Sequence, residues 1–220
     1  MTGSGPIGLL GGTFDPIHLA HLRLAQEARE ACGLAQVRFI PSALPPHRAN
    51  PGVSAAHRLR MVELAVAENP RFVADDRELL RSTPSYTVDT VASLRGDFGP
   101  DRPLCVIVGA DAFALFDTWK DWRHLLDAAH VIVATRPGST ILPAGADLRH
   151  QMLQRRTTDA TALDTRPGGL LFELQITAMD VSASRIREDL AAGREPRYLL
   201  PDSVLGYIAS NHLYRSPDAG

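Results

Sequence analysis

Residues 7–21 read IGLLGGTFDPIHLAH, and this stretch decides the fold. The apolar run Ile7–Leu10 predicts a buried strand, and Pro16–Ala31 has the residue spacing of a helix. Between them, Gly11 and Gly12 let the backbone turn sharply and approach a ligand closely. Asp15 is suited to cap the helix, which then begins with a proline. Amides at such a helix start favour phosphate, so we predict a phosphate-binding turn.

Two histidines follow this turn. His18 and His21 lie three residues apart, so on a helix they share one face. Their spacing does not match the four-residue spacing of a metalloprotease zinc site. From these residues alone, three interpretations stay open: phosphate binding, a zinc site, and a structural turn with two incidental histidines.

The rest of the chain repeats the order of strand and helix. Apolar runs predict strands at 37–40, 72–74, 104–108, 131–134 and 171–174, and helical spacing predicts helices at 57–68, at 87–94 and from about residues 182 and 203. Such alternation indicates a parallel sheet covered on both faces. We therefore expect a single domain over residues 1–220, an α/β Rossmann-like doubly wound parallel sheet with helices on both faces. Ligands of such sheets bind beyond the carboxyl ends of the strands.

A second glycine pattern, near the start of the sequence, matches a cofactor-binding motif but lies at the wrong place for it. Residues 3–8 read GSGPIG, which matches the G-x-G-x-x-G fingerprint of dinucleotide-binding proteins. That mechanism requires the glycines after the first strand and at the start of a helix. Here they precede or begin the strand, so we reject a hydride-transfer function.

Composition narrows the class of protein. The chain has 220 residues, 45% of them hydrophobic, and a formal net charge of −2, which argues against a general nucleic-acid or membrane-surface binder. Cys32 and Cys105 are expected to be buried free thiols rather than a disulfide. No signal peptide and no apolar run of about 20 residues is visible, so we expect a cytoplasmic protein. The sequence leaves a homo-oligomer open.

A basic segment lies near the end of the chain. Residues 181–187 read VSASRIR, in which Ser182 and Ser184 are plausible caps of a helix. Arg185 and Arg187 then occupy its first turn, where the helix dipole disfavours cations. Basic residues there are explained by an anion that docks at this end, or by a solvated face that happens to be basic.

Taken in order, these motifs resemble the nucleotidyltransferase superfamily, and specifically the bacterial nicotinate mononucleotide adenylyltransferases. The likeness covers essentially the whole chain and includes residues 45–48, 84–87, 109–111, 119, 136–138, 181–187, 199–201 and 213–215. Each motif alone is weak, but their joint order is highly specific. One departure is Ala20, because the family usually has glycine between the two histidines.

The resemblance implies transfer of the adenylyl group of ATP to nicotinate mononucleotide, which gives nicotinate adenine dinucleotide and pyrophosphate. It implies Mg²⁺ carried by the ATP phosphates, with no metal ligands from the protein. The implied catalytic residues are His18, His21 and Arg187, with Arg185 as a bystander. ATP would contact Gly11, Gly12, Thr13, Phe14, Gly109, Asp111, Arg136, Ser182 and Ser184, and the mononucleotide would contact His47, Arg48, Ser85, Tyr86, Thr87 and Trp119.

Alternatives remain at this level. Asp111 also fits a helix cap for residues 112–116, and Trp119 also fits the core. Without the resemblance, residues 85–87 read best as the cap of a helix. The competing functions are transfer to nicotinamide mononucleotide or to phosphopantetheine, and a catalytically silent nucleotide-binding regulator.

Overall fold

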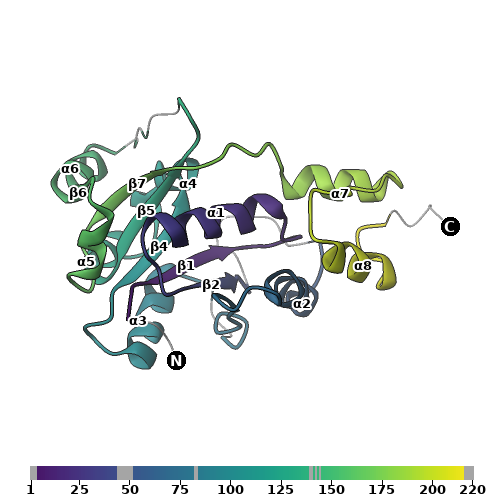
Figure 1. Ribbon diagram of the computed structural model, residues 1–220, viewed down its shortest axis with the longest axis horizontal. Coiled ribbons are helices and arrows are strands. Elements are labelled where there is room, and N and C mark those ends of the chain that lie inside the picture. Colours follow the sequence, from purple (N-terminus) through teal and green to yellow (C-terminus); the bar gives the residue numbers. More distant parts are fainter. Residues whose placement is uncertain are drawn as a thin grey trace.

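The computed structural model describes residues 4–43, 52–81, 84–138, 141, 143 and 145–215. Within these ranges the strands form a seven-stranded sheet in the order β3-β2-β1-β4-β5-β7-β6, and every neighbouring pair is parallel (Figure 1). The strands are β1 (Ile7–Gly12), β2 (Gln36–Pro41), β3 (Phe72–Ala74), β4 (Leu104–Gly109), β5 (His130–Thr135), β6 (Arg156–Thr157) and β7 (Leu171–Gln175).

Helices cover both faces of the sheet. They are α1 (Leu19–Ala31), α2 (Ala55–Val66), α3 (Thr87–Phe98), α4 (Ala110–Phe113), α5 (Trp122–Ala128), α6 (Ala146–Arg155), α7 (Ala183–Ala191) and α8 (Asp202–Ser210), with short 3-10 turns η1 (Phe116–Thr118) and η2 (Ala160–Asp164).

Two hydrophobic cores show how the faces are filled, because successive strand residues point to opposite sides of a sheet. On one face Leu10, Phe39 and Ile107 pack with residues of α1, α2, α7 and α8. On the other, Leu9, Val106 and Val108 pack with residues of α3, α5 and α6. The predicted doubly wound parallel sheet with helices on both faces is confirmed.

The start of the first helix differs from the prediction. α1 begins at Leu19 rather than Pro16, and its N-cap residue is His18 rather than Asp15. The Asp15 carboxylate cannot cap α1 because it accepts hydrogen bonds from the Gly52 amide (2.8 Å) and the Tyr214 hydroxyl (2.6 Å). The peptide bond between residues 15 and 16 is cis.

The expected sharp turn at the glycines is also wrong. Gly11 and Gly12 still belong to β1 and pair with Ile40 and Pro41 of β2. The positive φ that marks the turn falls instead on Phe14, at 49°. Gly12 instead allows the close approach of the Phe14 ring, which would lie 3.1 Å from an added side-chain carbon, whereas Gly11 leaves open space.

Sequence spacing did not predict α5 and α6. α5 is only seven residues long, and α6 buries only Leu148, so neither has a long apolar stripe. Both cysteines are free and buried, as expected, and burial raises the pKa of the Cys32 thiol to about 12.

In the part of the chain that the structure describes, no helix has the length and apolar character that crossing a membrane requires.

His130 is a fully buried histidine at the start of β5. The Leu170 amide donates to its Nδ1 (3.1 Å), so the neutral ring carries its proton on Nε2, which lies 2.9 Å from the Arg166 carbonyl oxygen. Burial is the main cause that lowers the pKa of His130 from 6.5 to about 4. Between these two values the unfolded chain binds the proton first, so the fold loses stability as the pH falls from 6.5 towards 4.

The variant His130→Gln tests this contribution, since glutamine can accept from Leu170 and donate to Arg166 but does not titrate. We expect the stability lost between pH 7 and pH 5 to be smaller in the variant by about 2 kcal/mol, as measured by urea unfolding at both pH values. Equal losses in the two proteins would show that His130 does not titrate in this way.

Candidate active site

The two predicted histidines stack on each other where α1 begins. Their ring centroids lie 3.7 Å apart, and the planes are inclined by 27°. The His18 amide donates to Nδ1 of His21 (3.2 Å), so a neutral His21 carries its proton on Nε2, where it can donate.

Burial lowers the pKa of His18 to about 4, so this ring is neutral at pH 7. Among the described residues nothing hydrogen-bonds to its buried Nδ1. An anion beside this ring would favour its charged form, so the histidine pair can supply donors to phosphate oxygens.

Arg187 connects the predicted motif at residues 181–187 to the predicted motif at residues 11–21. It lies on α7, and its Nη1 donates to the carbonyl oxygen of Asp15 (2.7 Å), 172 positions earlier in the chain. Its side chain is 35% exposed, so the guanidinium retains an open side. The histidines, residue 15 and Arg187 thus form one cluster beyond the carboxyl end of β1, where α7 lies in Figure 1.

The other residues of this motif take separate roles. Ser182 is the N-cap of α7, and its hydroxyl accepts from the Arg185 amide (3.3 Å). Ser184 is the second residue of the helix and not a cap, and its hydroxyl lies 3.4 Å from Nη2 of Arg187. Arg185 itself is exposed.

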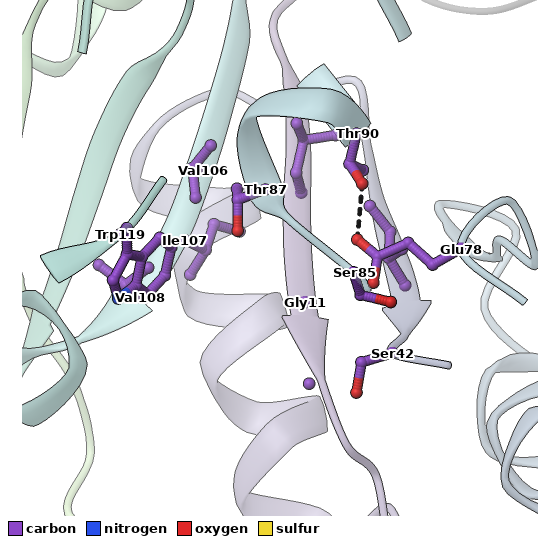
Figure 2. Close-up of a pocket in the computed structure, with 13 residues that line it drawn as sticks. Gly11, Ser42, Glu78, Ser85, Thr87, Thr90, Val106, Ile107, Val108 and Trp119 are labelled. Carbon is purple, nitrogen blue, oxygen red and sulfur yellow. Dashed lines mark hydrogen bonds between the residues drawn. The ribbon is translucent and has the colours of Figure 1, made fainter. Parts of the chain in front are cut away.

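A cavity of about 130 Å³ opens beside the ends of β1 and β4 (Figure 2). Five predicted residues line it together: Gly11, Gly12, Ser85, Thr87 and Trp119. A side-chain carbon added at Gly11 would meet no atom within 4 Å, so this glycine keeps the space open. The Trp119 ring stacks on Phe116 at 4.8 Å, which fixes one wall.

Three further residues of the cavity were missed by the sequence analysis: Ser42, Glu78 and Thr90. Glu78 is 7% exposed, and its carboxylate accepts from the Thr90 hydroxyl (2.6 Å). Burial raises the pKa of Glu78, and the hydroxyls of Thr90 and Ser85 oppose this rise. In the sequence, Glu78 ends the polar run DDRE at 75–78, and such a run is typical of a solvated loop.

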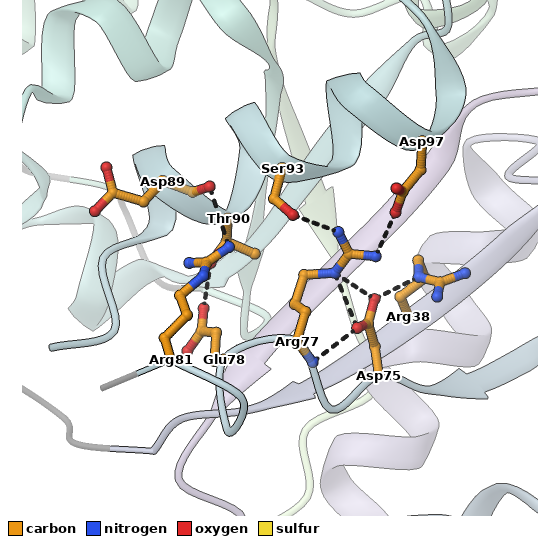
Figure 3. Close-up of polar contacts among 9 residues, drawn as sticks. All are labelled: Arg38, Asp75, Arg77, Glu78, Arg81, Asp89, Thr90, Ser93 and Asp97. Carbon is orange, nitrogen blue, oxygen red and sulfur yellow. Dashed lines mark hydrogen bonds and ion pairs between the residues drawn. The ribbon is translucent and has the colours of Figure 1, made fainter. Parts of the chain in front are cut away.

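The segment after β3 holds the start of α3 in place (Figure 3). Asp75 accepts from Arg38 of β2 (2.6 Å) and from Arg77. Arg77 then bonds to Ser93 and Asp97 on α3, and Arg81 bonds to the hydroxyl of Thr90. The helix α3 is therefore held by contacts from the segment 75–81, which Arg38 of β2 anchors in turn.

Other predicted residues lie along the same edge of the sheet. β4 ends at Gly109, which pairs with Ala134 of β5, so Asp111 and Arg136 follow two neighbouring strand ends. Gly109 is the N-cap of α4 and Asp111 lies in its first turn, so the alternative of a cap at Asp111 is wrong.

Several of the residues predicted to contact the substrates are only partly available to a ligand, or lie elsewhere. The Phe14 side chain is 2% exposed and packs against His21 and Phe39, so only its backbone is placed to meet a nucleotide. The Thr13 carbonyl oxygen already accepts from Arg58 (2.7 Å). Tyr86 lies under Lys120 and is not one of the cavity residues. His47 and Arg48 lie outside the described residues.

Comparison with known proteins places this arrangement in a family. Residues 9–189 match the family model described as cytidylyltransferase-like. A curated protein of Aeromonas salmonicida (strain A449), named "Probable nicotinate-nucleotide adenylyltransferase", is 51% identical over 96% of this chain and 98% of its own. A protein of the same name from Acidithiobacillus ferrooxidans is 47% identical over 95% of both chains.

The chain belongs to the nicotinate-nucleotide adenylyltransferase family. The predicted resemblance is thereby confirmed. A solved structure titled Plasmodium falciparum nicotinic acid mononucleotide adenylyltransferase complexed with NaAD has the same fold, with a TM-score of 0.70 over 96% of this chain and 97% of its own, at 16% identity.

In this member of the nicotinate-nucleotide adenylyltransferase family, the two arginines of α7 differ in position. Arg187 points to the carbonyl oxygen of Asp15, whereas Arg185 is exposed on the same helix. We expect Arg187→Ala to lower kcat/KM for ATP by about 10²- to 10³-fold, as for loss of one positioned donor, and Arg185→Ala to change it less than about twofold.

Steady-state kinetics with ATP as the varied substrate measures both variants, and Arg185→Ala is the matched control. Equal losses in the two variants would mean that the assignment of Arg187 is wrong.

Proposed function

We propose that this chain transfers the adenylyl group of ATP to nicotinate mononucleotide at the site formed by the histidine pair, Arg187 and the cavity beside β1. The products are nicotinate adenine dinucleotide and pyrophosphate. The observation that carries the proposal is the meeting of the two family motifs, where Arg187 donates to the carbonyl oxygen of Asp15 beside His18 and His21. The full-length likeness to nicotinate-nucleotide adenylyltransferases supports the same reaction.

The reaction is an in-line displacement at the α-phosphorus of ATP. The phosphate of the mononucleotide attacks, the bond to the leaving pyrophosphate breaks, and no protein nucleophile is needed because the attacking group is already an anion. The task of the protein is to align two anions that repel each other and to stabilise the added charge. We assign this task to His18, His21, Arg187 and the amides of residues 11–14.

The nucleotide and the mononucleotide then take opposite sides of the site. We assign the ATP ribose to Asp111, and the ATP phosphates to Arg136 and the start of α7 at Ser182 and Ser184. The nicotinate ring is assigned to Trp119 and its carboxylate to the start of α3, while His47 and Arg48 are proposed to meet phosphate.

The start of α3 is suited to a carboxylate. Its first helical residue is Thr87, and the N-cap residue Tyr86 makes no capping hydrogen bond with its side chain. The first-turn amides and the Thr87 hydroxyl can therefore donate hydrogen bonds to a carboxylate in the cavity. The helix dipole also favours negative charge at this position. Ser85 contributes less, because its hydroxyl hydrogen-bonds to the Glu78 carboxylate and its oxygen accepts from the Ala43 amide (3.1 Å).

Nucleotidyltransferases generally use a divalent metal with ATP. Among the described residues no group of three or more His, Cys, Asp or Glu side chains could hold a metal ion. Mg²⁺ commonly keeps water and substrate phosphate oxygens as ligands, so we propose that it enters with the triphosphate. When bound, it neutralises charge on the leaving pyrophosphate.

We further propose that residues 1–220 act as one nucleotidyltransferase domain in the cytoplasm. The two buried free thiols fit a reducing compartment.

The substrate assignment predicts a preference for nicotinate mononucleotide over its amide. The amide group would face donors and leave at least one unpaired, which costs about 1–3 kcal/mol, or roughly 5- to 150-fold in kcat/KM. The measurement is kcat/KM for both mononucleotides under identical ATP and Mg²⁺.

Thr87→Val should reduce this preference, and Thr165→Val, at the opposite edge of the sheet, should leave it unchanged. Equal kcat/KM values for the two mononucleotides in the unmodified protein would remove the carboxylate site at α3. No release of pyrophosphate with either mononucleotide would favour a silent nucleotide-binding regulator instead.

The histidine pair gives a second prediction. His18→Ala and His21→Ala should each lower kcat by about 10²- to 10³-fold, because each removes a positioned donor to phosphate. Their melting temperatures should change little, although their activities fall strongly. Variants that keep near-normal kcat, or that simply unfold, would contradict the assignment.

A further inference from the structure

Asp15 is a buried carboxylate at which three distant parts of the chain meet. It is 6% exposed, and its two carboxylate oxygens accept from different donors. The Gly52 amide donates to Oδ2 (2.8 Å) and the Tyr214 hydroxyl donates to Oδ1 (2.6 Å), from 199 positions later in the chain.

Arg187 lies beside this carboxylate without closing on it. Its Nη1 is 2.7 Å from the carbonyl oxygen of Asp15 but 3.8 Å from the carboxylate oxygen Oδ2. A charged guanidinium and carboxylate in direct contact bond at about 2.7–2.9 Å, so this pair stops short of a close ion pair. The charge of Arg187 is therefore left available on its open side.

A second arginine, Arg58, hydrogen-bonds to the loop that follows β1. Arg58 of α2 is 1% exposed, and its Nη1 donates to the Thr13 carbonyl oxygen (2.7 Å) while Nη2 lies 3.4 Å from the Ala43 carbonyl oxygen. Burial lowers the pKa of Arg58, and the charge of Asp15 opposes this effect. The carboxylate thus has a buried cation near it that does not depend on Arg187.

We propose that Tyr214 is a positioning residue that holds the Asp15 carboxylate and thereby keeps Arg187 free for the phosphates of ATP. This inference rests on the proposed role of Arg187. The Tyr214 hydroxyl remains a donor, because burial and the neighbouring carboxylate both raise the pKa of the phenol. Without that hydroxyl, Oδ1 is a buried acceptor with no donor, and the carboxylate gains by rotating towards Arg187, where it competes with phosphate.

The variant Tyr214→Phe removes this single hydrogen bond and keeps the ring. We expect it to lower kcat/KM for ATP by about 5- to 150-fold, the range for one buried acceptor left unpaired. In an Arg187→Ala background the same change should have less than about a twofold effect, because there is no guanidinium left to capture.

A matched control is Tyr207→Phe. Tyr207 lies on α8, and its hydroxyl is 2.8 Å from Nδ1 of His57, so this variant also loses one partly buried hydrogen bond in the last part of the chain. It should leave kcat/KM for ATP within about twofold. Calorimetric titration with inorganic pyrophosphate gives the same comparison without turnover, and melting curves report the fold.

The outcomes are separable. A Tyr214→Phe loss that is equally large in the Arg187→Ala background, no loss at all, or failure of Tyr214→Phe to fold would each overturn the proposal. If Arg187→Ala alone keeps normal kcat/KM and pyrophosphate affinity, the proposed role of Arg187 fails instead, and the role of Tyr214 fails with it. If the unmodified protein forms no dinucleotide, the proposed function fails, and the pyrophosphate titrations still decide whether Tyr214 acts through Arg187.

Discussion

The site depends on the place of β1 in the parallel sheet. β1 lies between β2 and β4, so the chain leaves it towards one side and later returns on the other. The connections that follow β1 and β4 therefore diverge, and a crevice forms at the carboxyl edge between them. The glycines of β1, Trp119 and the start of α3 meet in that crevice because the strand order brings them there.

A second constraint is the repulsion between two anionic substrates. We propose that the histidine pair meets it with ring N–H donors, with the buried His18 neutral before a ligand arrives, and that Arg187 meets it with a charge that is held by a carbonyl oxygen rather than by a carboxylate. Buried Asp15 joins this arrangement through hydrogen bonds with Gly52, Arg187 and Tyr214, which are far apart in the sequence. Electrostatic stabilisation of this kind requires donors that are in place before the reaction begins.

Local pattern predicted six of the seven strands that the structure describes, because these are short apolar runs such as 104–108. It missed β6, which is a polar edge strand of two residues. It was not enough for the start of α1, since the partners that occupy Asp15 come from residues 52 and 214. Arg58 was missed because it occupies the buried stripe of α2 beside Met61 and Val62, a place that spacing assigns to apolar residues. Glu78 had no local signal, because only the folding of 75–81 onto α3 buries it. Family resemblance, not spacing, separated Arg187 from Arg185.

In the proposed mechanism the protein aligns and stabilises the reactants and forms no covalent bond to them. The stereochemical course at the α-phosphorus tests this most directly, with ATP that carries sulfur in place of one α-oxygen in a defined configuration. One in-line displacement inverts the configuration in the dinucleotide, and inversion is the result that the account predicts. Retention would require two displacements through an adenylylated side chain, and would contradict the account.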